Sequence, residues 1–244
     1  MPQRLQKLIA NAGYGSRRWA EKRIEQGRVA LNNKKARVGD KAIIDDQVQI
    51  DGQLINLKRF VENETKVLIL NKKAGIVCTK KDEQGRKNVF DLLPKNTRWI
   101  MVGRLDLNTS GLLLFTNNGQ LANKLMHPSS QIDREYAVRV LGKVKEEHIK
   151  KLTNGVKLED GFAKFHKIIQ GGGEGANHWY RVVIREGRKR EVRRLWEFLD
   201  FKVSRLIRIR FGEIRLPDKL KSNQSQYLKP KQLQALLNSV NLKD

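Results

Sequence analysis

The apolar residues of this chain come in short runs, and this limits the available folds more than any other feature. The runs VLIL at residues 67–70 and LLLF at 112–115 have the length of buried strands. No run approaches the roughly 18 consecutive apolar residues that a membrane-spanning helix needs. The first residues turn polar before a secretory segment could form. We therefore expect a soluble, cytoplasmic protein that does not contact membranes.

Composition and length refine this expectation. With 39% hydrophobic residues, the chain can bury a core of its own. Its 244 residues are enough for one full domain and a small companion. Strand-length and helix-length patterns are mixed along the chain, which indicates the α+β class.

The charge balance is strongly basic. The chain carries 50 Lys and Arg against 26 Asp and Glu, a formal net charge of +24. Such an excess favours binding to nucleic acid, because cations release the counterions condensed on phosphates. A surface that serves only solubility is the alternative. Repulsion between like charges also favours a monomer.

The metal-binding residue types are sparse. The single cysteine, Cys78, excludes an internal disulfide framework and a site with several thiolate ligands. The four histidines are scattered without the paired spacing of metal ligands, at positions 127, 148, 166 and 178. We expect neither a metal nor a cofactor.

Residues 1–60 form a compact module in this interpretation. Residues 4–12 have the apolar spacing of an amphipathic helix. Ser16 is a candidate N-cap for a second helix that ends before Gly27, and strand-like pieces follow at 28–31 and 47–50. The second helix carries the basic residues Arg17, Arg18, Lys22 and Arg23. This order resembles the S4-type RNA-binding domain, in which such cations bind phosphates; an ordinary solvated helix face is the alternative.

The segment from 61 to 216 has an α+β texture. We expect strands at 66–70, 99–102, 112–116 and 134–140, and a β-hairpin made of 165–169 and 179–184. Its loop, GGGEG at 171–175, lacks the Lys and Ser or Thr of a nucleotide-binding loop. Helices are expected at 119–126, 146–152 and 190–199. Residues 217–244, with an amphipathic stretch at 231–240, are expected to form a peripheral C-terminal appendage.

Two segments of this second region place charged residues next to apolar strands or helices. GRLDLNTSG at 103–111 sets Asp106 in a loop between two strands, although such residues also cap turns. The segment REGRKREVRR at 185–194 is a basic run. Its Val192 has helical spacing with Leu195 and Trp196, and we therefore expect some of its arginines to turn inward. A buried arginine needs an anionic partner, and Asp106 is a candidate.

A third segment, REY at 134–136, opens an alternating strand. The simplest interpretation of Tyr136 is a half-buried strand aromatic.

Together these segments resemble the signature of bacterial rRNA pseudouridine synthases, in the branch that carries an S4-type domain. The likeness extends over GRLD at 103–106, NTSGLLL at 108–114, LANKLMHPS at 121–129, REYAVRV at 134–140 and EGRKREVRRLW at 186–196. In NKKAG at 71–75, Lys73 replaces a proline that family members usually carry and that would stiffen the turn. The resemblance implies a small S4-like α/β RNA-binding domain, followed by a catalytic domain built on a mixed, largely antiparallel sheet.

The resemblance also implies roles for individual residues. Asp106 would act on the anomeric carbon or the 2′ hydrogen of a uridine, two routes that the residues leave open. Arg193 would pair with Asp106, and Tyr136 would stack on the target base. Arg104 would enter the RNA stack when the uridine is flipped out of it. The basic residues that would contact phosphates are Arg17, Arg18, Lys22, Arg23, Arg188, Lys189, Arg190 and Arg194.

The implied substrate is a stem-loop of large-subunit ribosomal RNA, recognised more by its shape than by a long sequence. A pseudouridine synthase of small-subunit rRNA is one alternative. A non-catalytic S4-type RNA-binding or ribosome-assembly factor is another, although such a factor does not need an aspartate within a basic, RNA-facing loop. A DNA-binding regulator is disfavoured, because no recognition helix or dimerisation seam is evident.

Overall fold

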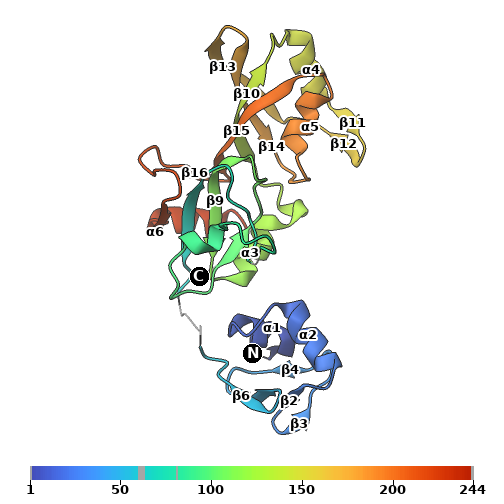
Figure 1. Cartoon of the computed structure of the whole chain (residues 1–244), viewed down its shortest axis with the longest axis vertical. Coiled ribbons are helices and arrows are strands. Elements are labelled where there is room, and N and C mark those ends of the chain that lie inside the picture. The colour runs from blue at the N-terminus through green and yellow to red at the C-terminus, as the bar shows by residue number, and fades with distance from the viewer. Residues whose placement is uncertain (1, 60–63, 81, 243–244) are drawn as a thin grey trace. The chain divides into compact units, whose positions relative to one another are not determined.

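The computed structural model describes residues 2–59, 64–80 and 82–242. The chain divides into two compact units, shown in Figure 1. One comprises Met1–Glu64 and Lys95–Arg98, and the other comprises Thr65–Pro94 and Trp99–Asp244. The expected boundary after residue 60 lies outside the described residues. The short segment 95–98, expected in the second domain, groups with the first unit.

The first unit packs two short helices on small antiparallel sheets. Its elements are β1 (Gln3–Arg4), α1 (Leu5–Asn11), α2 (Arg17–Glu25), β2 (Val29–Leu31), β3 (Lys34–Lys35), β4 (Lys41–Ala42), β5 (Val48–Ile50) and β6 (Gln53–Ile55). Strand β1 pairs with β4, and the other sheet has the order β3-β2-β5-β6. Leu5, Leu8 and Ile9 of α1 are buried in the core of this unit, as their spacing predicts.

The predicted start of the second helix is confirmed. The Ser16 hydroxyl accepts a hydrogen bond from the backbone N–H of Trp19 at 3.0 Å, which satisfies one of the free donors at the beginning of α2. The chain leaves this helix through Gly27, which has a φ of +68°.

The second unit is built on a nine-stranded sheet of order β13-β14-β10-β15-β9-β7-β17, with β8 and β16 attached to β9 and β15. Its strands are β7 (Val67–Lys72), β8 (Ile100–Val102), β9 (Ser110–Thr116), β10 (Arg134–Leu141), β13 (Lys167–Glu174), β14 (Asn177–Ile184), β15 (Lys202–Phe211), β16 (Ile214–Arg215) and β17 (Ser225–Tyr227). Strands β9 and β15 are parallel, and the other strand pairs in the described part of this sheet are antiparallel. The expected α+β class is confirmed.

Two hydrophobic cores cover opposite faces of this sheet. One core contains Leu113, Tyr136 and Trp196 and lies under α4 (Glu146–Asn154) and α5 (Glu191–Glu197). The other contains Leu112 and Leu114 and lies under α3 (Gly119–Met126) and α6 (Pro230–Asn238). Neighbouring residues of β9 enter different cores because successive side chains of a strand point to opposite faces. Short 3₁₀ helices at Val89–Leu92 and Pro128–Ser130 and a small hairpin of β11 (Val156–Leu158) and β12 (Gly161–Ala163) complete the unit.

Two expectations about this unit were wrong. The C-terminal segment is not a peripheral appendage: β17 pairs with β7 at the edge of the main sheet, and Leu236 and Leu237 of α6 are buried in a core. Three glycines expected in a hairpin loop, at 171–173, lie within β13 instead. Strand pairing and core contacts made over long sequence distances account for both differences. Among the described residues, no helix is long and apolar enough to cross a membrane.

Candidate active site

The loop that contains Asp106 connects β8 to β9 along one face of the sheet. Asp106 is half-buried, and its neighbours Arg104 and Leu107 are exposed. The second residue of β9 is Gly111, which has a φ of +101°, and a Cβ atom at this position would lie 2.3 Å from the carbonyl oxygen of Arg208. Only glycine allows β9 and β15 to approach this closely.

A buried lysine binds the backbone of this loop. The Lys72 side chain, at the end of β7, is fully buried, and its Nζ donates to the carbonyl oxygens of Asp106, Leu107 and Thr109 at 3.2, 3.3 and 2.8 Å. Burial lowers the pKa of Lys72, and the nearby Asp106 opposes this shift. Lys72 was not singled out from the sequence, although its position inside the NKKAG motif was a usable signal.

Arg193 binds the same loop from α5. Its Nη2 donates to the carbonyl oxygen of Asn108 at 3.1 Å, and its Nη1 donates to that of Val203 at 2.8 Å. The side chain is buried, which lowers its pKa, while the negative charge of Asp106 acts in the opposite direction. The inward orientation expected for one arginine of this segment is therefore found. No ion pair within 4.0 Å joins Arg193 to Asp106 among the described residues, because the guanidinium binds backbone carbonyls instead.

Arg208 of β15 is the third buried cation at this loop. Its side chain is 2% exposed, and its Nε donates to the carbonyl oxygen of Leu112 at 2.7 Å. Its Nη2 is buried without a hydrogen-bond partner in the described structure. Arg208 was not singled out from the sequence, although Leu206 and Arg208 occupy alternate positions of a half-buried strand.

Tyr136 lies on the same face of the sheet. It is directly opposite Arg208 on the neighbouring strand β15, so that the two side chains share one face. Tyr136 is buried in the core that lies under α5. Arg134, two residues earlier on β10, is also buried; its Nη1 donates to the carbonyl oxygens of Ile132 and Arg185 at 3.0 and 2.7 Å. The structure thus brings Asp106, Arg193 and Tyr136 to one face of the sheet.

The chain is similar to proteins of known families over both of its units. A family model described as RNA pseudouridylate synthase matches residues 66–197, and an S4 domain model matches residues 3–48. The chain belongs to the RNA pseudouridylate synthase family. The family match includes Lys72, Asp106, Tyr136 and Arg193 and ends before Arg208.

Similar curated proteins are named ribosomal large subunit pseudouridine synthase B. The protein of Pseudomonas aeruginosa is 51% identical over 99% of this chain and 63% of its own length. That of Escherichia coli strain K12 is 52% identical over 89% of this chain and 76% of its own length. A solved structure of a pseudouridylate synthase aligns with a TM-score of 0.67 at 26% identity, covering 96% of this chain and 99% of that one. The protein is therefore an isomerase with an S4 RNA-binding domain.

Lys73, which replaces the proline expected from the family pattern, makes a backbone hydrogen bond. Its backbone N–H donates to the side-chain oxygen of Asn223 at 3.2 Å. Asn223 and Gln224 also bond with the backbone of Asn71. A proline has no N–H and could not make the first of these bonds. The C-terminal segment thus secures the turn in this pseudouridylate synthase.

The basic run at 185–194 is largely neutralised within the protein. Arg188 and Arg194 both bind the carboxylate of Asp160, at 3.1 and 2.8 Å, and Arg190 binds Glu197 at 2.9 Å. Lys189 is exposed. Phosphate binding by these residues stays a prediction, and for the three arginines it requires competition with internal carboxylates.

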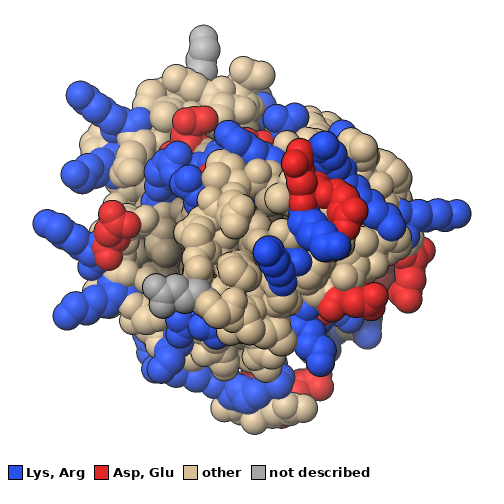
Figure 2. Space-filling model, turned by 90° about the horizontal axis from the view of Figure 1, so that it is seen from above, with Lys and Arg blue, Asp and Glu red and all other residues tan. Residues whose placement is uncertain are grey.

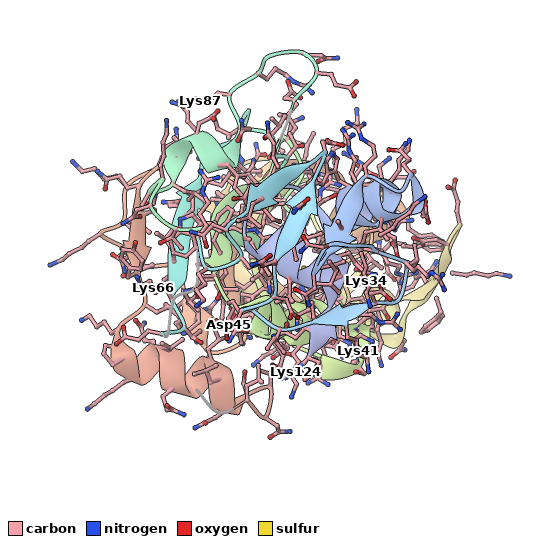
Figure 3. The ribbon with its side chains drawn as sticks, turned by 90° about the horizontal axis from the view of Figure 1, so that it is seen from below. Lys34, Lys41, Asp45, Lys66, Lys87 and Lys124 are labelled. Carbon is pink, nitrogen blue, oxygen red and sulfur yellow. The ribbon has the colours of Figure 1, made fainter. Side chains whose placement is uncertain are left out.

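The S4 domain presents its cations more openly. Arg17, Arg18 and Lys22 of α2 are exposed. Arg23 is half-buried and pairs with Asp51 at 3.5 Å while lying 5.2 Å from the Trp19 ring centre. Figure 3 labels further lysines on the strands of this unit, Lys34 and Lys41, together with Asp45.

Proposed function

We propose that this pseudouridylate synthase isomerises one uridine in a stem-loop of large-subunit (23S) ribosomal RNA. The observation that carries this proposal is the geometry of the Asp106 loop. The buried cations Lys72, Arg193 and Arg208 bind backbone carbonyls of the loop and of the strand that follows it. Among the described residues, no hydrogen bond or ion pair involves the Asp106 carboxylate itself. A carboxylate in this position is available to a substrate.

The reaction breaks the bond between N1 of uracil and C1′ of the ribose, rotates the base, and joins C5 to C1′. A proton leaves C5 and N1 gains one, so that no redox change occurs. We assign to the Asp106 carboxylate either attack on C1′ or removal of the 2′ hydrogen. Both routes need a negatively charged oxygen, and the cations Lys72 and Arg193 supply the electrostatic environment that suits it.

The target uridine must leave its stack before Asp106 can reach its sugar, at a cost of a few kcal/mol. We assign to Tyr136 the stacking contact with the flipped base. Arg104 is exposed near Asp106, and we propose that its side chain enters the RNA stack at the position that the base leaves. Contacts between the S4 domain and RNA phosphates offset the cost of flipping. The names of the similar proteins favour large-subunit rRNA over small-subunit rRNA. We infer a monomer that works in the cytoplasm, without a cofactor.

The proposal is tested with the Asp106→Asn variant. We expect it to abolish pseudouridine formation in 23S rRNA, while RNA affinity stays the same or rises because a negative charge near phosphates is lost. Asp218→Asn, which removes an exposed carboxylate elsewhere in the same unit, is the matched control and should keep full activity. An Asp106→Asn enzyme that still forms pseudouridine would rule out the assigned role.

Mapping of pseudouridine in total rRNA identifies the target. Cells with and without the gene should differ at a single uridine of 23S rRNA. A difference confined to small-subunit rRNA contradicts the proposed substrate, and no difference at all supports a non-catalytic RNA-binding factor.

A further inference from the structure

The four strands β13, β14, β10 and β15 form one half of the main sheet, and within the described residues of this unit helices lie on one face of these strands only (Figure 1). Tyr136, Val138 and Val140 of β10 belong to the core that lies under α4 and α5. The alternate residues of these strands therefore point to the opposite face, which we call the outer face. The charged and aromatic residues of the outer face that matter here are Arg139, Lys167, Trp179, Arg181, Arg205 and Arg210.

In the described part of the chain, no core covers the outer face. The apolar residues of this face belong to none of the hydrophobic clusters of the described residues; they include Ala137, Ile169, Trp179, Val183 and Ile207. Of the six residues named above, Lys167, Arg181 and Arg205 are exposed, and the other three are half-buried. A sheet face without a hydrophobic layer is either solvated or the binding site of a partner.

Like charges lie next to one another on this face. Arg139 and Arg205 are directly opposite on β10 and β15, an arrangement that destabilises a sheet unless an anion compensates it. Arg139 donates to the Ser204 hydroxyl at 2.9 Å. For the Arg205 side chain, the described part of the chain provides no hydrogen bond or ion pair. The paired arginines therefore lack an anionic partner among the described residues.

A cleft of about 380 Å³ opens at the edge of the same face, between Lys167, Arg181 and Arg210. The buried carboxylate of Glu135 accepts a hydrogen bond from Arg210 Nε at 2.7 Å and lies 4.0 Å from Arg181 Nη1. Burial lowers the pKa of Arg210, but the bonds to Glu135 and Asp133 outweigh this effect and raise it. Glu135 thus orients two guanidinium groups, and the cleft keeps an excess of positive charge.

We propose that the outer face binds the sugar-phosphate backbone of a second segment of the substrate RNA. Guanidinium groups match phosphate oxygens, and Trp179 offers an aromatic surface to an unpaired base. Residues 135 and 136 point to opposite faces of β10, so a stem-loop bound at Asp106 and Tyr136 leaves the outer face open. The bound segment therefore lies outside the target stem-loop. This inference rests on the proposed function for the identity of the RNA.

The test compares two substrates, the isolated target stem-loop and full-length 23S rRNA. The full-length variant Arg181→Gln/Arg205→Gln removes two exposed charges of the outer face. We expect its KM for full-length RNA to rise roughly tenfold and the slope of log affinity against log salt to fall by roughly 1.4 to 1.8. The kcat on both RNAs and the KM for the stem-loop stay unchanged. Lys219→Gln/Lys231→Gln, two exposed lysines elsewhere in the same unit, is the control.

Unchanged affinity and salt slope for full-length RNA would overturn the proposal and leave the outer face to solvent or to an acidic protein. An equal loss on both RNAs would also overturn it, because the variant would then affect the catalytic face. If the wild-type protein formed no pseudouridine in either RNA, the proposed function would fail, while the binding comparison would still test the outer face.

A second measurement places the RNA directly. Leu141 at the end of β10 is 44% exposed, whereas the natural Cys78 is buried. An iron chelate attached to Leu141→Cys should cleave full-length rRNA at positions outside the target stem-loop. Cleavage confined to the stem-loop, or none above the wild-type background, would contradict the proposal.

Discussion

At the scale of single residues, the position of Asp106 depends on cations that bind its backbone rather than its carboxylate. Lys72, Arg193 and Arg208 come from three different elements and bind carbonyl oxygens between residues 106 and 112. Each buried charge thereby gains acceptors, which a buried cation requires. The loop is held rigidly while the carboxylate stays available, a requirement for a reaction that tolerates little displacement of the reacting groups.

The two guanidinium nitrogens of Arg193 allow a test of whether the position of Asp106 depends on the cations that bind the loop. In Arg193→Lys, a single flexible ammonium group replaces the planar guanidinium whose two nitrogens bind Asn108 and Val203, so the fixed geometry that joins these two carbonyls is lost. We expect pseudouridine formation in single-turnover assays to fall by about tenfold or more, with RNA affinity unchanged. Arg190→Lys, at an exposed arginine of the same segment, should remain active. Full activity of Arg193→Lys would show that charge alone suffices.

At the scale of elements, ion pairs join the ends of the central strands. Asp133 lies just before β10; its carboxylate binds Arg185 after β14 at 2.9 Å and Arg210 of β15 at 3.4 Å. Partial burial raises the pKa of Asp133, but the two arginines outweigh it and hold the pKa below its usual 3.8. The ionised form is therefore favoured by folding.

The lowered pKa of Asp133 predicts how the stability of the folded protein changes with pH. A carboxylate with a lowered pKa contributes stability above pH 3.8, and this contribution is lost as the pH falls through the lower pKa of the folded state. Asp133→Asn should therefore have a lower Tm than the wild type at pH 7, and the difference should shrink below pH 3.8. Thermal denaturation followed by circular dichroism checks this, with Asp218→Asn as the control. A difference in Tm that is independent of pH would exclude the ion pairs as its cause.

At the scale of the whole molecule, the candidate catalytic residues lie in one unit, and exposed cations occur in both. The first has its own core and exposed cations on α2, and the second contains Asp106, Arg193 and Tyr136. Figure 2 shows Lys and Arg side chains scattered over the visible face and projecting around its rim, with fewer Asp and Glu side chains between them. A long polyanion is the partner that such a surface fits.

Removal of residues 1–60 should reduce RNA affinity and flatten its dependence on salt, because phosphate contacts are lost. The full-length variant Arg17→Gln/Arg18→Gln should lower the salt slope by a smaller amount, roughly 1.4 to 1.8. Filter binding across a salt series measures both slopes. Slopes equal to that of the wild type would show that the S4 domain does not contact phosphates.

Local patterns were sufficient to predict much of this protein. Ser16 was identified as a helix cap because a cap bonds within three residues, and the runs at 67–70 and 112–115 as strands because burial follows their local composition. Asp106, Tyr136 and Arg193 were proposed as site residues from a resemblance to family motifs, and their catalytic roles stay predictions. The roles of Lys72, Arg208 and Asn223 were missed, since nothing in the local pattern indicates their partners.

What the sequence by itself determined is the class of fold, the basic character, and the residue types of the site, since these depend on composition and on neighbours along the chain. Only the tertiary structure decided which groups meet. Lys72 binds Thr109 across 37 positions, Arg193 binds Asn108 across 85, and Lys73 binds Asn223 across 150. The pattern of burial along a strand shows that a side chain turns inward, but its partner is set by the order in which distant strands pair.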